Sequence, residues 1–211
     1  MKTIHKILIV SAFIGITAAV VVSCNKENTT RETIAPTVST EMPAPKVFPY
    51  TQFATVLTNY WKALDSTYQA NPTAFLRICN NNDYDSLNII SHITLQQNMT
   101  LDSMLNIFYS DLGNSSVPIS TPCSSCQADA LSNLASVIVS IRFYMNELKT
   151  VNIGAEIYDA ITATDSDLDL CIRQCLSDNY NNNLSLHACE ITCILTTVSV
   201  SLNDQYMAIH P

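Results

Sequence analysis

The chain has 211 residues and a formal charge of −8, because eighteen acidic side chains outnumber ten basic ones, and 47% of its residues are hydrophobic. This length and apolar content are enough for a buried core and argue against a wholly disordered chain. Binding to a nucleic-acid backbone needs clustered Lys and Arg, and the three glycines form no phosphate-binding loop. We therefore expect no nucleic-acid partner and no cofactor.

The first 24 residues have the pattern of an export signal. Lys2 and Lys6 precede the apolar run 7–22, which is short for a membrane span but suits a signal peptide. The tetrad Val-Val-Ser-Cys that ends at Cys24 resembles the lipobox of bacterial lipoproteins. This resemblance implies that residues 1–23 are removed as a signal peptide and that Cys24 becomes the lipidated first residue, with diacylglyceryl and palmitate chains.

A lipid anchor would make the membrane a partner of the mature protein. Loss of the leader leaves eight basic and eighteen acidic residues, so acyl chains rather than protein charge would hold the chain on a membrane. The step Lys26-Glu27 resembles the surface-export signal of Bacteroidota lipoproteins. Three triplets resemble the O-glycosylation motif of that phylum: Asp65-Ser66-Thr67, Asp85-Ser86-Leu87 and Asp102-Ser103-Met104. We expect a location in the bacterial cell envelope, on the periplasmic or the surface face of the outer membrane.

Composition divides the mature chain into a tether and a folded part. Residues 24–48 are rich in Thr, Ser, Pro and charge, and they carry too little apolar surface to fold alone. We predict a flexible, lipid-anchored tether there and an α-helical domain over residues 49–211. Within that domain, Gly, Asn, Ser and Pro gather in residues 113–122, which we predict to be an internal boundary.

Apolar residues recur at helical spacing through the folded part, and no alternating strand bounded by hairpin turns competes with them. We predict an all-α fold, a bundle of six or seven helices. Asn71 followed by Pro72 predicts the N-cap and first turn of a short helix, and Thr51 and Thr100 are predicted to cap two others. The remaining predicted helices span 86–97, 122–148, 157–172 and 191–202.

Two CxxxC pairs, Cys171/Cys175 and Cys189/Cys193, predict a helical hairpin at the C-terminus. Cysteines four residues apart share one face of a helix. The pairs are symmetric about residue 182, inside an Asn-Asn-Asn turn signal, so an antiparallel hairpin pairs Cys171 with Cys193 and Cys175 with Cys189. The layout resembles the α-hairpinin and twin-CxxxC coiled-coil-helix families, in which two disulfides staple a helix pair. The resemblance implies a scaffold and no shared activity.

A zinc site is the alternative for the hairpin, made of four thiolates or of three with His187. Exported proteins meet oxidising conditions, in which disulfides persist. We therefore predict two disulfides and no metal at the hairpin.

Cys123 and Cys126 form a CxxC motif that Pro122 places at the start of a predicted helix. A helix N-terminus lowers the pKa of a thiol, as thiol–disulfide oxidoreductases require. However, no βαβ pattern surrounds the motif and no His follows it, as haem attachment would need. A structural disulfide, within the motif or to Cys79, remains open beside redox chemistry and metal binding. Seven cysteines beyond Cys24 leave at least one thiol free, in a mixed disulfide or in an intermolecular disulfide, and Cys79 is the candidate.

The sequence contains neither an HExxH nor a GxSxG motif. His92 is predicted to pack within a helix, and Asp165, Asp167 and Asp169 to form a solvated acidic face rather than a calcium loop. We therefore expect no catalytic residues, and a lipid-anchored envelope protein that binds a protein or small ligand through its helical domain. The alternative is a thiol–disulfide or metal-handling protein that uses the CxxC motif.

Overall fold

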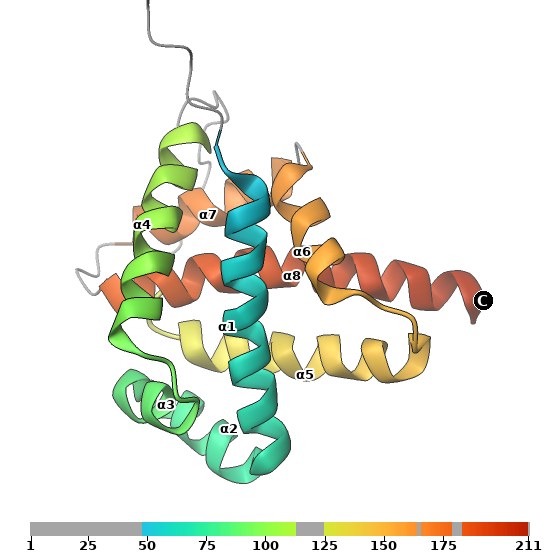
Figure 1. Cartoon of the computed structure of the whole chain (residues 1–211), viewed down its shortest axis with the longest axis horizontal. Coiled ribbons are helices and arrows are strands. Elements are labelled where there is room, and N and C mark those ends of the chain that lie inside the picture. Colours follow the sequence, from blue (N-terminus) through green and yellow to red (C-terminus); the bar gives the residue numbers. More distant parts are fainter. Residues whose placement is uncertain (1–47, 113–124, 164–165, 179–182, 211) are drawn as a thin grey trace, which may run out of the picture. The chain divides into compact units, whose positions relative to one another are not determined.

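The computed structural model describes residues 48–112, 125–163, 166–178 and 183–210. Every regular element in these ranges is a helix, which confirms the all-α prediction, although there are eight helices rather than six or seven (Figure 1). The predicted signal peptide, Cys24, nearly all of the tether and the boundary 113–122 lie outside the described residues. The helices are α1 (Tyr50–Ala70), α2 (Pro72–Asn80), α3 (Tyr84–Ile90), α4 (Leu95–Leu112), α5 (Ala130–Leu148), α6 (Ile153–Thr162), α7 (Ser166–Ser177) and α8 (Asn183–Ile209).

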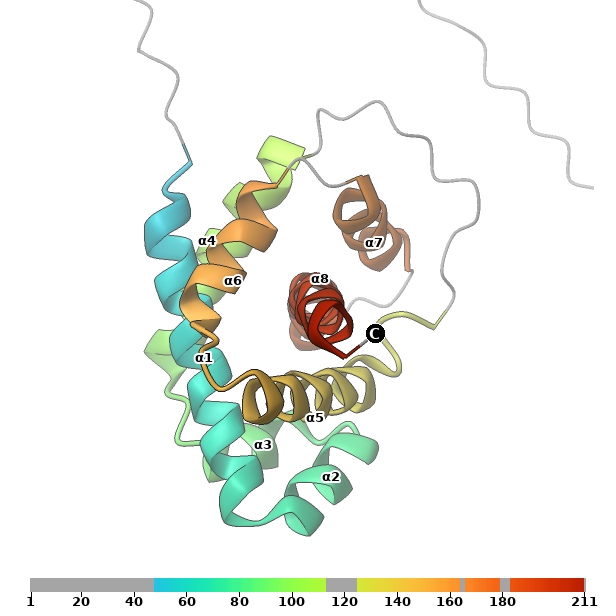
Figure 2. The same ribbon diagram turned by 90° about the vertical axis from the view of Figure 1, so that its right-hand side faces the viewer.

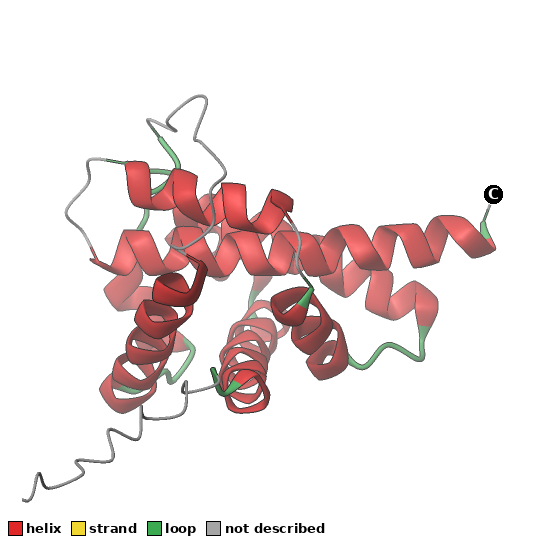
Figure 3. Ribbon diagram, turned by 90° about the horizontal axis from the view of Figure 1, so that it is seen from above, coloured by secondary structure: helices red, strands yellow, loops and turns green. Residues whose placement is uncertain are grey.

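The helices of the folded domain form two layers that cross steeply. In Figure 1, α5 and α8 run side by side, while α1, α4 and α6 cross them. Figure 2 looks along α8 and shows α5, α6 and α7 around it. In Figure 3, which is seen from above, α8 is the long helix that runs across the picture toward the C-terminus. α8 is therefore the central helix of the described fold.

The apolar composition of α8 follows from this central position. Ile194, Leu195, Val198 and Leu202 are each at most 1% exposed. By length and composition alone, Leu184–Ile209 could also cross a membrane, but 56% of the window tested is buried inside the fold. A helix that is covered on several sides needs apolar residues around most of its circumference. Burial against its neighbours therefore accounts for the apolar residues of the first and middle turns, whereas Val200, Met207 and Ile209 toward the C-terminus are exposed.

The first described residue already packs into the core of the folded part. Phe48, the last residue of the predicted tether, is 5% exposed, and its ring lies 5.4 Å from the ring centroids of Phe53 and Phe108. α1 has Pro49 at its N-cap, so the prediction that Thr51 caps this helix is wrong. Aromatic packing, rather than a side-chain cap, accompanies the start of α1.

The boundary between α3 and α4 differs from the prediction because a capping box lies at Thr94 and Gln97. The backbone N–H of Gln97 donates to Thr94 Oγ1 at 3.2 Å, and the backbone N–H of Thr94 donates to the side-chain oxygen Oε1 of Gln97 at 2.6 Å. This reciprocal pair starts α4 inside the helix predicted over 86–97. The predicted cap Thr100 instead lies within α4, where its hydroxyl donates to the Gln96 carbonyl at 2.9 Å.

One further helix was predicted wrongly. The single helix expected over 157–172 is divided into α6 and α7, because the backbone becomes extended at Ala163. α8 begins at Asn183, just after the predicted turn and eight residues before Ile191, the first apolar residue that marks this helix in the sequence. Its first two turns contain several polar residues, so the apolar periodicity that identifies the rest of the helix does not reveal them.

A partly buried ion pair links α1 to α5. Arg142 Nη1 lies 2.8 Å from Asp65 Oδ1, and Gln69 Nε2 donates to the other carboxylate oxygen at 2.7 Å. Asp65 is only 8% exposed, so its carboxylate has little contact with water. Arg142 and Gln69 replace that water, one at each carboxylate oxygen. This contact joins the two crossing layers through a polar side chain.

Side-chain caps start α2 and α6. Asn71 Oδ1 accepts from the Ala74 amide at 3.0 Å, which confirms the predicted cap, and Asn152 Oδ1 accepts from the amides of Gly154 and Ala155. Each cap satisfies amides that have no partner within the helix.

We predict that Asn71→Ala lowers the free energy of unfolding by about 1 kcal/mol, because the substitution removes the N-cap of α2. Chemical denaturation followed by circular dichroism measures the change. The control is Thr73→Ala, at an exposed position in the same turn, which should leave stability unchanged or slightly increase it. Equal losses in both variants would show that the cap does not stabilise α2.

Candidate functional site

Two disulfides join α7 to α8, and they have the predicted pairing. Cys171 bonds Cys193 and Cys175 bonds Cys189, each with Cα atoms 5.8 Å apart. The C-terminal disulfide-stapled hairpin is therefore confirmed. The zinc alternative at these positions is wrong, because all four sulfur atoms are engaged in disulfide bonds.

The described part of the CxxC motif packs against this hairpin. Cys126 lies in the turns before α5, not in a first helical turn, and it is disulfide-bonded. Its partner is not among the described cysteines, and Cys123 lies outside the described residues. Gln127 is 2% exposed and donates its Nε2 to the Cys175 carbonyl at 2.6 Å. Two cysteine motifs that are distant in sequence are thus adjacent in the fold.

Three other candidate residues from the sequence have structural positions. Cys79 is the predicted free thiol and is fully buried; burial raises its pKa to about 12, so the thiol stays protonated at neutral pH. His92 is not packed within a helix as predicted but is exposed in the turn before α4, with φ of 55°. Asp169 is not solvated as predicted: it is 6% exposed, and Arg173 Nε lies 2.9 Å from its Oδ1.

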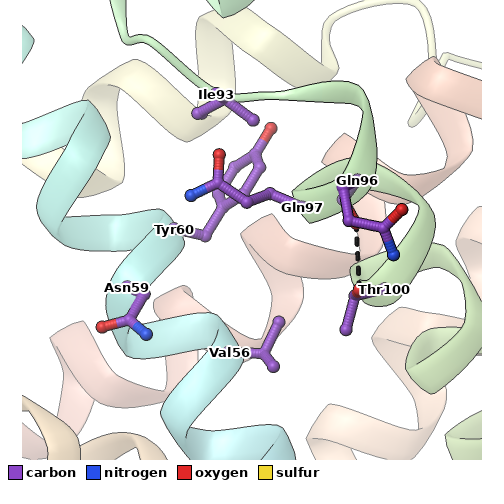
Figure 4. A pocket seen from close by; sticks show the side chains of 7 residues that line it. All are labelled: Val56, Asn59, Tyr60, Ile93, Gln96, Gln97 and Thr100. Carbon is purple, nitrogen blue, oxygen red and sulfur yellow. Dashed lines mark hydrogen bonds between the residues drawn. The ribbon is translucent and has the colours of Figure 1, made fainter.

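A cavity of about 150 Å³ lies between α1 and the start of α4 (Figure 4). Its apolar surface comes from two aliphatic side chains and one tyrosine ring, and its polar surface from three carboxamides and one hydroxyl. None of the described lining residues is charged. These residues are Val56, Asn59, Tyr60, Ile93, Gln96, Gln97 and Thr100.

Local structure brings these side chains together. Val56, Asn59 and Tyr60 share one face of α1 because they are three and four residues apart. On the other side, the capping box that starts α4 holds Gln97 by its side chain. The capping box therefore has two roles. It marks the start of α4, and it positions the Gln97 carboxamide at the cavity.

A second and much smaller cavity, of about 20 Å³, lies behind Tyr60 and has room for about one water molecule. Tyr60 lines both cavities, so its side chain lies between them. The small cavity is also lined by Tyr84, Asp102 and His187, which come from α3, α4 and α8. The larger, uncharged cavity, called the outer pocket below, thus borders a group of ionisable side chains in which His187 is buried and Asp102 is partly exposed.

The closest contact in this group joins α4 to α8. His187 Nδ1 lies 2.6 Å from Asp102 Oδ1, without the alignment of a good hydrogen bond. Burial lowers the pKa of His187 below its ordinary value of 6.5, while the nearby Asp102 carboxylate opposes this shift. The histidine is therefore neutral at pH 7.

Glu190 is the most deeply buried acid of the described chain. It is 0% exposed, and neither carboxyl oxygen has a hydrogen-bond partner. Burial and then the nearby Asp102 carboxylate raise its pKa to about 9, so Glu190 is protonated and neutral at pH 7. Burial also raises the pKa of Tyr60. Desolvation thus keeps Glu190 uncharged at pH 7, and it shifts the pKa values of His187 and Tyr60 further toward their neutral forms.

The arrangement fits binding better than catalysis. An oriented imidazole is a common general base, but its substrate must reach it. Here the cavity beside His187 holds about one water, and Tyr60 lies between it and the larger pocket. Within the described ranges, no three His, Cys, Asp or Glu residues are placed to hold a metal ion.

The chain matches no protein-family model, and no curated protein or solved structure is significantly similar to it. The functional argument therefore depends on the residues themselves.

Sequence reasoning missed both cavities and the buried acid. The carboxamides of the outer pocket follow no motif, since they come from two helices whose crossing the sequence does not specify. For His187 and Glu190 a signal was present: apart from the cysteines, they are the two ionisable side chains between Asn183 and Asn203, and they lie three positions apart. Asp102 was noted only as part of a possible glycosylation triplet, and its contact with His187 is purely tertiary.

We predict that the free energy of unfolding falls as pH rises from about 6.5 to 8.5, and that Glu190→Gln removes most of this fall, leaving only the smaller contribution of the buried Cys79 thiol near pH 8.5. Folded Glu190 keeps its proton up to a pKa of about 9, whereas the unfolded side chain, with its ordinary pKa of 4.5, has lost it. Unfolding therefore releases a proton in this window, and each pH unit removes at most about 1.4 kcal/mol. Urea titrations across this pH range measure the slope.

His187 acts with the opposite sign and in a lower window. Its lowered folded pKa means that unfolding takes up a proton below pH 6.5, so its contribution is lost as pH falls and is constant above that value. The matched control is Glu147→Gln on the exposed end of α5, which should keep the wild-type slope. An unchanged slope in Glu190→Gln would contradict the assignment of the buried proton.

Proposed function

We propose that this chain is a lipid-anchored binding protein of the bacterial envelope, whose helical domain takes a small uncharged ligand. The observation that carries the proposal is the doubly disulfide-bonded hairpin in a chain with a lipobox-like leader. Disulfides persist outside the cytoplasm, and the leader specifies export with lipidation at Cys24. Both features support the same location.

The lining of the outer pocket supports the ligand class. Carboxamides and a hydroxyl both donate and accept hydrogen bonds, while aliphatic and aromatic surface favours apolar contact. A charged ligand would lose its hydration in this pocket without gaining an opposite charge. A neutral molecule with an apolar edge and polar substituents fits this surface best.

We predict that Cys24→Ser abolishes membrane anchoring. In the wild type, labelled palmitate should be incorporated and the protein should sediment with membranes, whereas the variant should carry no label and keep its leader. Cys79→Ser is the matched control, since it removes a cysteine far from the leader. Palmitate incorporation by Cys24→Ser would contradict the proposed anchor.

We predict that Thr100→Trp weakens binding of an uncharged aromatic probe, N-phenyl-1-naphthylamine, at least about tenfold, a loss of about 1.4 kcal/mol. The larger side chain would occupy the pocket between α1 and α4. Fluorescence titration of the full chain measures the dissociation constant.

Thr162→Trp is the control for this experiment. Thr162 lies on α6 and, like Thr100, donates its hydroxyl to the carbonyl four residues earlier, so both variants lose the same kind of intrahelical bond. The control should bind the probe as the wild type does. A wild type that binds no probe, or equal binding by all three proteins, would overturn the assignment of the pocket.

A further inference from the structure

The two hairpin disulfides are in direct contact with each other. Cys175 Sγ lies 3.6 Å from Cys193 Sγ, although these sulfur atoms belong to different disulfides. This separation is van der Waals contact for sulfur. A thiolate at either position would therefore be adjacent to a disulfide that it can attack.

We propose that the hairpin is a thiol-exchange site, in which a thiol enters at Cys171 and the disulfide bond moves inward to join Cys175 and Cys193. The inference goes beyond ligand binding and does not depend on the outer pocket. It assigns a reaction to residues for which the sequence implied a scaffold alone.

Burial selects Cys171 as the entry point. Cys175 is 0% exposed, Cys193 2% and Cys189 6%, whereas Cys171 is partly exposed at the surface of the core. Thiol–disulfide exchange requires the incoming thiolate to reach a sulfur atom. An external thiol therefore meets Cys171 before the other three.

The exchange proceeds in balanced steps. The external thiolate bonds to Cys171 Sγ, the Cys171–Cys193 bond breaks, and Cys193 leaves as a thiolate. Cys193 then bonds to Cys175 Sγ, the Cys175–Cys189 bond breaks, and Cys189 leaves as a thiolate that takes up a proton. A second external thiol releases Cys171 as a thiol and forms the external disulfide. Overall, two thiols are oxidised to one disulfide, and the hairpin exchanges two disulfides for one disulfide and two thiols.

Two features favour the internal step. The leaving group of the first attack is already ionised, so the raised pKa of a buried thiol does not delay the second attack. Cys175 and Cys193 are 18 residues apart in sequence, and the original pairs are 22 and 14 residues apart. The entropy of loop closure is therefore nearly the same for the new disulfide as for either original one. The hairpin can therefore accept two electrons and remain cross-linked.

Four single substitutions test the proposal on the full chain, exported with its own leader and purified in detergent. Cys171→Ser and Cys189→Ser both keep the contacting sulfur atoms of Cys175 and Cys193. Cys171→Ser leaves Cys193 without its disulfide partner, and Cys189→Ser leaves Cys175 without its partner. We expect both variants to carry a Cys175–Cys193 disulfide as the main species, with Cys189 or Cys171 respectively as the alkylated thiol. Cys175→Ser and Cys193→Ser remove one contacting sulfur and should keep their remaining original disulfide.

The disulfides can be mapped without ambiguity by mass spectrometry. Samples are quenched in acid and alkylated under denaturing conditions, which prevents later exchange. Cleavage before Asp169 and Asp178 and after Arg173 and Glu190 separates all four hairpin cysteines onto different peptides. Wild-type protein is treated briefly with dithiothreitol and mapped in the same way, so that the result does not depend on the folding of a variant.

The outcomes separate exchange from stapling. A Cys175–Cys193 peptide pair in partly reduced wild type and in the first two variants supports the proposal. If Cys171→Ser keeps its Cys175–Cys189 bond with Cys193 alkylated, and partly reduced wild type lacks the new pair, the proposal is overturned. Cross-links to Cys79 or other random pairings would overturn it equally, because they would show unfolding rather than exchange between neighbours.

Discussion

The burial of α8 on several sides is the constraint on which the rest of this fold depends. α5, α6 and α7 surround it, and residues such as Ile194 and Val198 have no exposed surface at all. Such a helix must be apolar around most of its circumference, which gives it a composition that resembles a membrane span. The layer that crosses it, α1, α4 and α6, then needs only one apolar face per helix. This leaves polar side chains of α1 and α4 available to line the outer pocket.

The same constraint determines the chemistry of the polar residues that α8 carries. A polar group on a surrounded helix cannot reach water, so it must find a partner or lose its charge. His187 lies beside Asp102 on α4 without a well-aligned hydrogen bond and is neutral, and Glu190 keeps its proton. His187 and Glu190 are therefore neutral because α8 is buried at these positions. Tyr60 lies between this group and the outer pocket, which makes it the one side chain common to both.

The sequence predicts what local chemistry specifies and misses what tertiary contacts specify. The hairpin pairing follows from cysteine spacing and an Asn-rich turn, and the cap at Asn71 follows from one short motif; both are confirmed. The start of α4 is also encoded locally, by Thr94 and its glutamine partner three residues later; Thr100, the predicted cap, has no such partner. The pocket and the buried acid depend on how helices cross, which periodicity does not encode. The leader, the tether and Cys24 remain predictions, because they lie outside the described residues.

The two disulfides flank the buried acid of α8. Glu190 stands between Cys189 and Cys193 in sequence, on the part of α8 that carries the costly polar groups. A buried carboxyl without hydrogen-bond partners costs about 1–3 kcal/mol, and a disulfide typically stabilises by about 2–4 kcal/mol. One disulfide is therefore comparable to the cost of the buried acid, and the two disulfides together exceed that cost. A hairpin with this reserve can give up one disulfide while the other still offsets that cost, which is the condition that exchange between the two requires.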